Sequence, residues 1–222
     1  MSYFVWVRNV IAKNIPVIGE LELAFQECVC PVVAITGTKG KTTTTELTTR
    51  ILQGCGLRTM ASGNIGLPFA NAVRQSASMD VMVLEVSSFQ LETIQTFRPK
   101  VSAWLNLSAN HLDRYPGMQE YRAAKLRLFE NQTAEDFAVI TIATGRNPAP
   151  AIEKFLSEIG LEDMPVYTDL KQRLAREMGV MGLPVSILID REGREVARLT
   201  GGADWNSDSA HAIIAAMIGE EG

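Results

Sequence analysis

Short, almost continuous apolar runs recur along the first part of the chain, up to about residue 142. Four of these runs are rich in Val, Ile, Leu and Ala and have the length of a strand: residues 31–36, 81–86, 101–107 and 137–142. A strand that is apolar on both faces is typical of a parallel sheet with helices on both sides, because water reaches neither face. The pattern therefore predicts four parallel strands.

Longer segments of mixed polarity separate these runs, and their length suits crossover helices. The predicted helices are residues 41–53, 67–75, 89–96 and 118–131. The last of them follows Pro116-Gly117, a pair that interrupts regular structure. Alternating strands and helices are characteristic of the α/β class, so we expect a three-layer α/β/α fold of the P-loop type with a mostly parallel sheet.

The pattern changes past about residue 142. Residues 148–159 and 170–178 have helix length and are each followed by glycine, while residues 165–168 suit a short strand. A last helix is predicted over residues 205–218. Its N-cap is predicted to be Asn206, Ser207 or Asp208, because these short polar side chains accept a hydrogen bond from the first helical turn.

Two neighbouring strand patterns near the C-terminal end predict a β-hairpin. They are residues 185–190 and 195–199, joined by a turn in which Gly193 can adopt a positive φ. We expect the main sheet to end in this antiparallel pair.

The composition is that of a folded globular protein and excludes several classes. The chain has 222 residues, of which 46% are hydrophobic, with 21 Lys and Arg against 25 Asp and Glu. Without a basic run it offers no electrostatic footprint for nucleic acid or an anionic membrane. No apolar run approaches the roughly 20 residues of a membrane span, and three cysteines are too few for a disulfide framework. We therefore expect a cytoplasmic protein with reduced thiols.

The strongest chemical signal lies between the first predicted strand and the first predicted helix. Its residues are Gly37, Thr38, Lys39, Gly40, Lys41, Thr42 and Thr43. A glycine-containing loop at a helix N-terminus can wrap an anion with backbone N–H groups. In such a loop the lysine, here Lys41, reaches the β and γ phosphates, and the following Thr42 binds Mg²⁺. The alternative is an ordinary strand-to-helix turn.

Further blocks along the chain carry a resemblance to a known family. They are GNIG at residues 63–66, LEVSSFQLE at 84–92, NLSANHLDR at 106–114 and YRAAKLR at 121–127. Together with the loop, and with a lead-in at residues 15–22, they resemble the central ATP-binding domain of the Mur ligases. The resemblance covers residues from about 15 to 138.

This resemblance implies an ATP-dependent chemistry. In the family, ATP phosphorylates a carboxylate and an amine then displaces phosphate to form an amide. The implied ligands are ATP or ADP with Mg²⁺, with Lys41 and Thr42 holding the phosphates and the first metal ion. Asn64 would help to position the phosphates. Lys39 stands where the family commonly has Asn, which adds a cation to the loop.

Three more residues are implied in metal binding and catalysis. By resemblance, Glu85 and His111 ligate metal, and Lys125 is carbamylated by CO₂ to support a second metal ion. Each has a simpler alternative: Glu85 as a capping carboxylate at a strand end, His111 as a hydrogen-bonded loop histidine, and Lys125 as a solvated helix lysine. Lys41 and Lys125 are thus the candidate catalytic residues.

From about residue 139 the chain resembles something else, the C-terminal half of a thioredoxin-like thiol:disulfide interchange redoxin. The resemblance rests on TIATGRN at residues 141–147, GVMGLPV at 179–185 and ILIDREGREVAR at 187–198. It implies a cis bond before Pro184. The C-x-x-C pair that performs thiol exchange is absent from the sequence, so no redox activity is expected.

The two resemblances suggest a recombined or engineered chimera, with residues 1–138 and 139–222 folding as a single domain, a monomer or homodimer. We expect nucleotide binding without full ligase activity, and at most slow ATP hydrolysis, because the sugar-binding and closing domains are not recognised in the sequence. One alternative is a purely structural chain in which Glu85, His111 and Lys125 fail to converge on the loop. Another is a truncated Mur-type ligase.

Overall fold

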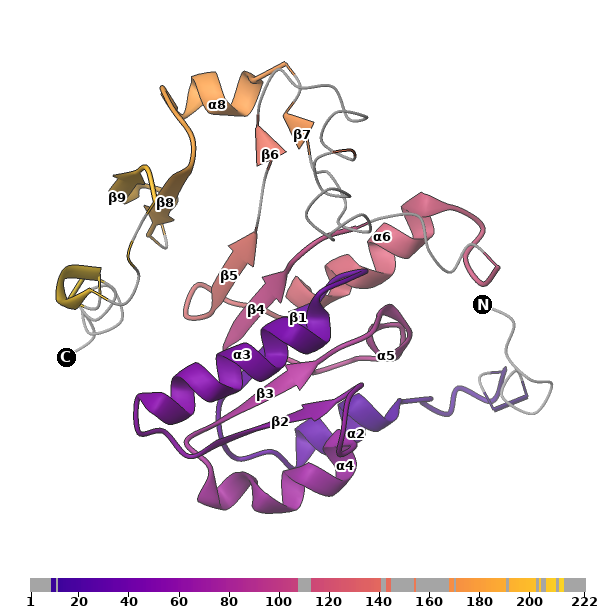
Figure 1. Ribbon diagram of the computed structural model, residues 1–222. Helices are drawn as coiled ribbons and strands as arrows, with labels where there is room; N and C mark the ends of the chain where they lie inside the picture. The colour runs from indigo at the N-terminus through magenta and orange to yellow at the C-terminus, as the bar shows by residue number, and fades with distance from the viewer. Residues whose placement is uncertain are drawn as a thin grey trace. The chain divides into compact units, whose positions relative to one another are not determined.

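The computed structural model describes residues 9–10, 12–107, 113–140, 143–144, 154, 168–169, 171–190, 192–202, 204, 207–210 and 212–213. The chain divides into two compact units (Figure 1). The first unit contains residues 1–143 and 147–168, and the second contains residues 144–146 and 169–222. The single-domain organisation expected from the sequence stays a prediction.

A parallel five-stranded sheet forms the centre of the first unit. Its strands are β1 (Val32–Thr36), β2 (Thr59–Gly63), β3 (Val81–Glu85), β4 (Val101–Trp104) and β5 (Phe137–Ile140). They lie in the order β2-β3-β1-β4-β5, and every pairing between neighbours is parallel. The chain leaves central β1 toward β2 and later returns to place β4 on its other side. Ligands of open α/β sheets bind at the carboxyl ends of the strands where the order reverses in this way.

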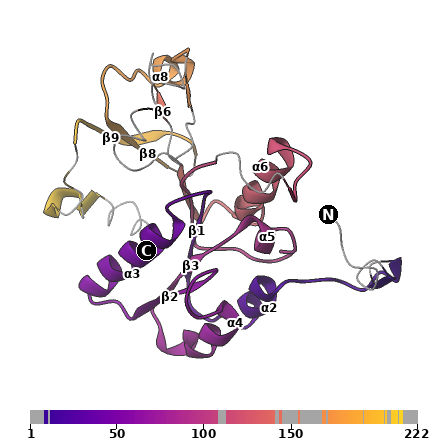
Figure 2. The same cartoon turned by 45° about the vertical axis from the view of Figure 1, so that its right-hand side comes forward.

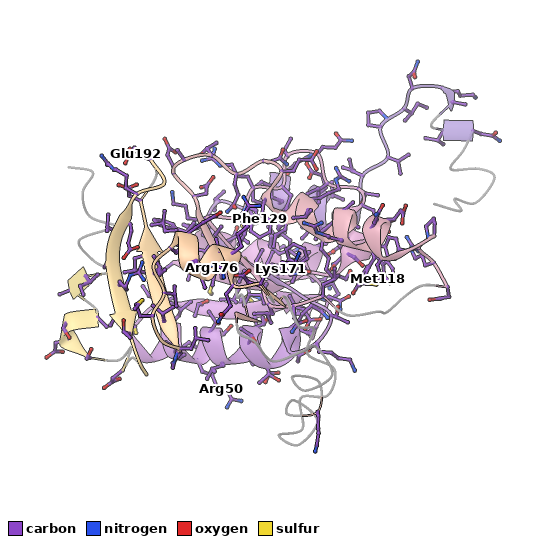
Figure 3. The ribbon with its side chains drawn as sticks, turned by 90° about the horizontal axis from the view of Figure 1, so that it is seen from above. Arg50, Met118, Phe129, Lys171, Arg176 and Glu192 are labelled. Carbon is purple, nitrogen blue, oxygen red and sulfur yellow. The ribbon has the colours of Figure 1, made fainter. Side chains whose placement is uncertain are left out.

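Helices cover both faces of this sheet. They are α2 (Glu20–Gln26), α3 (Lys41–Gly54), α4 (Phe69–Ala72), α5 (Ser88–Leu91) and α6 (Met118–Leu126), with 3-10 segments η1 (Val73–Ser78) and η2 (Arg127–Phe129). Figure 2 shows α3 on one side of the sheet and α2, α4, α5 and α6 on the other. In Figure 3, Arg50 projects from the outer side of α3, away from the sheet. The expected mostly parallel α/β sheet with helices on both faces is confirmed.

The apolar core lies on the side of α2 and α4. Leu21, Phe69, Met82, Leu84 and Phe97 are fully buried there. Removing side chains of this size from water stabilises the fold by about 1.5 to 3 kcal/mol each. The core thus anchors β1 and β3 and gives the loop at their carboxyl ends a rigid support.

The four predicted strands of this unit are present, and α3 and α6 begin at the predicted residues. Strand β2 was not predicted, because TMASG contains only two apolar side chains and this strand lies at the sheet edge. The helix predicted over residues 67–75 is a four-residue α4 followed by a 3-10 segment.

The helix predicted over residues 89–96 ends at Leu91. A capping box between Ser87 and Gln90 sets its start. After Leu91 the chain turns away because the buried Glu22 carboxylate accepts the N–H groups of residues 95, 96 and 97.

The second unit contains α8 (Arg173–Glu177) and an antiparallel hairpin of β8 (Val185–Ile189) and β9 (Glu195–Thr200). Gly193 has φ 79°, as the turn requires, and Glu192 marks this turn in Figure 3. The Leu183–Pro184 peptide bond is cis, as expected. Ser207 accepts a hydrogen bond from the backbone N–H of Ala210 at 3.3 Å, as predicted for an N-cap.

The expectation that the main sheet ends in the hairpin is wrong. In the part of the chain that the structure describes, β8 and β9 pair only with each other, as do the short strands β6 (Ala143–Thr144) and β7 (Thr168–Asp169). Alternating apolar residues predict a strand but not its partner, because pairing depends on tertiary packing.

Several predicted elements are shorter or lie outside the described residues. Helix α8 occupies only part of the range 170–178. Strand β7 begins at the last residue of the range 165–168, whose other residues are not described. The helix predicted over 148–159 falls almost wholly outside the described residues, as does most of the range 205–218. None of the helices over the described residues is both long enough and apolar enough to cross a membrane.

Candidate functional site

The loop of residues 37–40 joins the carboxyl end of β1 to the start of α3. Gly40 caps α3 with φ 76°, a left-handed conformation that side chains other than glycine rarely adopt. Thr36 fastens the start of the loop by donating to the backbone oxygen of Val86 at 2.8 Å. Because α3 is 14 residues long, its first N–H groups carry the partial positive charge of a helix N-terminus. The loop therefore has the form of an anion-binding site.

A row of hydrogen-bonded polar side chains lies beside the N-terminus of α3. Thr42 donates its hydroxyl to Oε2 of Glu85 at 2.7 Å, and Asn64 donates its amide N–H to Oε1 at 2.9 Å. Glu85 ends β3, which pairs with β1 next to the loop. Three predicted site residues are thus brought into direct contact.

Gly63 makes the approach of Asn64 possible. The backbone N–H of Asn64 donates to the carbonyl oxygen of Glu85 at 2.9 Å. Gly63 has φ 101°, and a Cβ at this position would lie 2.4 Å from that same oxygen. A larger residue would push β2 away from β3 and move the Asn64 amide from the carboxylate.

Lys41 lies at the start of α3 and folds over the loop. Its Nζ donates to the carbonyl oxygen of Thr38 at 3.0 Å. Burial lowers the pKa of Lys41, the charge of Glu85 opposes this, and the charge of Lys39 adds to the lowering. A bound phosphate would oppose this lowering, because a nearby anion stabilises the protonated form of the lysine.

Lys125 approaches the loop from α6 on the opposite side of the sheet. It is 1% exposed, and its Nζ donates to the carbonyl oxygen of Gly37 at 2.8 Å. The same nitrogen lies 4.9 Å from the centre of the Tyr121 ring. The reading of Lys125 as a solvated helix lysine is therefore wrong, because α6 packs this face against the loop.

The surroundings of Lys125 change its acid–base behaviour. Burial and the nearby charge of Lys41 lower its pKa to about 7, although Glu85 opposes the shift. A buried ammonium loses hydration that the protein replaces only in part. At neutral pH a large fraction of Lys125 is thus a neutral amine, which is the form that reacts with CO₂.

Two residues that the sequence analysis did not single out also hold the loop. Asn106 follows β4, and its side-chain oxygen accepts the N–H groups of Thr38 at 2.8 Å and Lys39 at 3.0 Å. The Tyr121 hydroxyl lies 3.2 Å from the Thr38 hydroxyl. Both residues occur within the sequence blocks quoted above, but a block does not show which of its members contact the loop.

The oxygen donors at the site suit a hard divalent cation. Mg²⁺ prefers carboxylate and hydroxyl oxygens, and Thr42 and Glu85 offer these side by side. No group of three or more His, Cys, Asp or Glu side chains suited to a metal ion occurs among the described residues. His111, the remaining predicted ligand, lies outside them.

The structure thus gathers most of the predicted site residues. Thr38, Lys39, Lys41, Thr42, Asn64, Glu85 and Lys125 all make contacts at the loop or at the start of α3, through side chain or backbone. Gly37 and Gly40 form the backbone of the loop. Thr43 lies exposed in the first turn of α3.

Comparison with known proteins supports the resemblance to the Mur ligases. Residues 35–165 match the Mur ligase middle domain. The match continues past residue 138, where the resemblance was expected to end. The chain is 54% identical over 134 residues to UDP-N-acetylmuramoylalanine–D-glutamate ligase of Syntrophotalea carbinolica, covering 60% of this chain and 30% of the relative. The Geotalea uraniireducens enzyme of the same name is 44% identical over 184 residues, covering 83% and 39%. The chain spans less than half of the length of these relatives.

Solved structures resemble the chain more distantly. A MurF ligase from Thermotoga maritima in complex with ADP has 18% identity and a TM-score of 0.43, covering 67% of this chain and 34% of that one. FolC from E. coli in complex with ADP has 16% identity and a TM-score of 0.42, covering 73% and 49%.

Proposed function

Because the chain belongs to the Mur ligase middle domain family, we propose that it binds ATP or ADP with Mg²⁺ through the loop and helix start of residues 37–43. The observation that carries the proposal is the contact of Thr42 with Glu85 at 2.7 Å, beside the N-terminus of α3. A phosphate site needs positive groups and a metal site needs oxygen donors, and this end of the sheet offers both.

Each residue has a definite task in this proposal. The first N–H groups of α3 would receive phosphate oxygens, aided by the helix dipole. Lys41 would exchange the Thr38 carbonyl for the β and γ phosphates, gaining a stronger, charge-assisted hydrogen bond. Thr42 and Glu85 would hold Mg²⁺, and Asn64 would keep the carboxylate of Glu85 oriented. Bound Mg²⁺ neutralises charge on the transferring phosphoryl group.

Lys125 is proposed to serve as the carbamylated lysine implied by the family. Its neutral amine would attack CO₂ to form a C–N bond, releasing one proton and leaving an anionic carbamate. The pKa of about 7 supports this step, because an ammonium has no lone pair for the attack. The carbamate oxygens would then be candidate ligands for a second Mg²⁺. Addition of ¹³C-bicarbonate should give a carbamate NMR signal that is absent from Lys125→Met.

The relatives are named as ligases, and for this chain we propose at most slow ATP hydrolysis, without full ligase activity. Amide formation also needs a carboxylate and an amine held within about an ångström of their reactive positions beside the phosphate. The alternative of a purely structural chain is disfavoured, because Glu85 contacts Thr42 and Lys125 contacts Gly37.

Calorimetric titration of ADP and ATP, each with Mg²⁺, tests the proposal. Wild type should bind in the micromolar range, and Lys41→Ala should lose detectable binding. The matched control is Lys13→Ala, which removes an exposed lysine outside the loop. Glu85→Gln should bind nucleotide with much less dependence on Mg²⁺. No heat with wild type at millimolar nucleotide would overturn the proposal.

For the second unit we propose the redoxin-like fold without redox activity. The hairpin of β8 and β9 after α8 supports the fold. All three cysteines, Cys28, Cys30 and Cys55, precede this unit, and none forms a C-x-x-C pair. In an insulin-reduction assay with thioredoxin as positive control, turnover by this chain would refute the proposal.

Two proposals remain for the origin of the whole chain. The chimera rests on the redoxin-like sequence blocks from about residue 139. The truncated Mur-type ligase is supported by the family match that continues to residue 165. A single-domain chimera should unfold in one calorimetric transition, whereas two transitions would contradict that organisation.

A further inference from the structure

Asn106 lies just beyond the carboxyl end of β4 and contacts the first half of the phosphate loop. Its Oδ1 accepts two backbone N–H groups, from Thr38 at 2.8 Å and from Lys39 at 3.0 Å. Its Nδ2 donates to the carbonyl oxygen of Lys39 at 2.9 Å. These three bonds also fix the orientation of the amide, because the reverse orientation would bring N–H groups face to face.

The backbone of Asn106 is held as firmly as its side chain. Its carbonyl oxygen accepts the indole N–H of Trp104 at 2.9 Å and a second, longer contact from the N–H of Thr38 at 3.2 Å. The residue is 2% exposed. A buried side chain with both polar atoms bonded is costly to displace, because its departure would leave several polar groups without partners.

This arrangement divides the loop into two parts. In a phosphate-binding loop the backbone N–H groups normally point at the anion. Here the N–H groups of Thr38 and Lys39 point at Asn106 instead. The N–H groups that follow, from Gly40 into α3, are then the ones that serve the phosphates.

We propose that Asn106 is a positioning residue. By accepting the Thr38 and Lys39 N–H groups it prevents them from binding the anion, and so confines phosphate binding to the backbone N–H groups from Gly40 onward. The phosphate part of this inference rests on the proposed nucleotide binding. The hydrogen bonds from these two N–H groups to Asn106 exist in the free protein, so they can be tested without any nucleotide.

Two substitutions separate the contributions of Asn106. Asn106→Ala removes both acceptor and donor, so the first half of the loop loses its fixed shape. Asn106→Asp keeps the acceptors for Thr38 and Lys39 but loses the donor to the Lys39 carbonyl. The matched control is Asn131→Ala, which removes two side-chain hydrogen bonds, to the carbonyls of Gln95 and Phe97, outside the loop.

Amide hydrogen exchange in nucleotide-free, ¹⁵N-labelled protein is the first measurement. In wild type the Thr38 and Lys39 amides should be protected, and in Asn106→Ala their exchange should accelerate about tenfold or more. Asn106→Asp should restore part of the protection, and Asn131→Ala should leave it unchanged. Equal exchange rates at these two amides in wild type and Asn106→Ala would overturn the proposal.

Titration of the labelled proteins with ADP and Mg²⁺ is the second measurement. The amide signals of Gly40, Lys41 and Thr42 should shift far more than those of Thr38 and Lys39. Asn106→Ala should weaken ADP binding about tenfold or more, because the loop must be ordered on binding. Shifts at Thr38 and Lys39 as large as those at Lys41 would also overturn the proposal. A wild type that does not bind ADP would refute the proposed function, while the exchange rates would still decide the role of Asn106.

Discussion

Glu22 is a fully buried carboxylate, and its conversion to the amide tests how the first unit is held together. Oε2 accepts the N–H groups of Gln95 at 2.8 Å and Phe97 at 3.0 Å. Oε1 accepts the N–H of Thr96 at 2.9 Å and also its hydroxyl, together with the Gln26 amide at 3.2 Å. One side chain on α2 thus binds the three residues that redirect the chain toward β4.

Glu22→Gln replaces one of these acceptor oxygens by an NH₂ group. Whichever oxygen is lost, at least two donors then face another donor. A buried donor without a partner costs about 1 to 3 kcal/mol, so the free energy of unfolding should fall by about 2 to 5 kcal/mol. Urea unfolding at pH 7 measures this as a lower midpoint at unchanged m.

The control is Glu46→Gln on the exposed side of α3, which should change stability by less than about 0.5 kcal/mol. A Glu22→Gln midpoint equal to that of the control would refute the reasoning.

The pH dependence of stability gives an independent check on Glu22. Burial alone raises its pKa, but the hydrogen bonds from Gln95, Thr96 and Gln26 outweigh burial and leave the pKa below the ordinary value of 4.5. Its contribution is therefore present above about pH 4.5 and is lost as the pH falls through the folded-state pKa. Between pH 5 and pH 3, roughly the range where glutamates titrate, wild type should lose more stability than Glu22→Gln. Parallel pH profiles would contradict this assignment.

Three further outcomes are expected. The folded-state pKa of Lys125, about 7, is below its ordinary 10.5, so wild-type stability in CO₂-free buffer should rise between pH 7 and 10 relative to Lys125→Met. The slope should be up to about 1.4 kcal/mol per pH unit, and parallel urea-unfolding profiles would contradict it. Thr42→Val should weaken ADP binding about tenfold or more in the presence of Mg²⁺ but little in its absence. Calorimetry measures both affinities, and an equal loss under the two conditions would contradict the role of Thr42 as a metal ligand. Burial and the neighbouring Cys28 raise the pKa of Cys30 to about 12, so iodoacetamide at pH 8 should label exposed Cys55 before Cys30. Peptide mass spectrometry measures the order, and faster labelling of Cys30 would contradict the prediction.

Local sequence predicted the framework of the site because the relevant signals are short in range. The apolar runs placed β1, β3 and β5 within one or two residues over the described parts of the chain, while β4 ends three residues before the predicted range 101–107 does. The glycine and lysine spacing of the loop predicted its position before α3. These features depend only on residues that are close together along the chain, so the sequence is sufficient to predict them.

Contacts between distant residues had to come from the tertiary structure. The pairing of Glu85 with Thr42 joins residues 43 positions apart, and that of Lys125 with Gly37 spans 88. The sequence left Lys125 open between a carbamylated and a solvated lysine, and the packing of α6 excludes the solvated one by burying the side chain. Strand β2 escaped prediction because an edge strand needs few apolar residues.

The sequence by itself thus determined the α/β class, the central strands and the residues of the phosphate loop, because periodicity and motif spacing are local properties. The tertiary structure alone decided the hairpin's pairing, the pKa of Lys125, and the hydrogen bonds with which Asn106 and Glu22 hold distant backbone. Burial and hydrogen-bond partners arise only when separate segments pack together, and one-dimensional spacing does not contain that information.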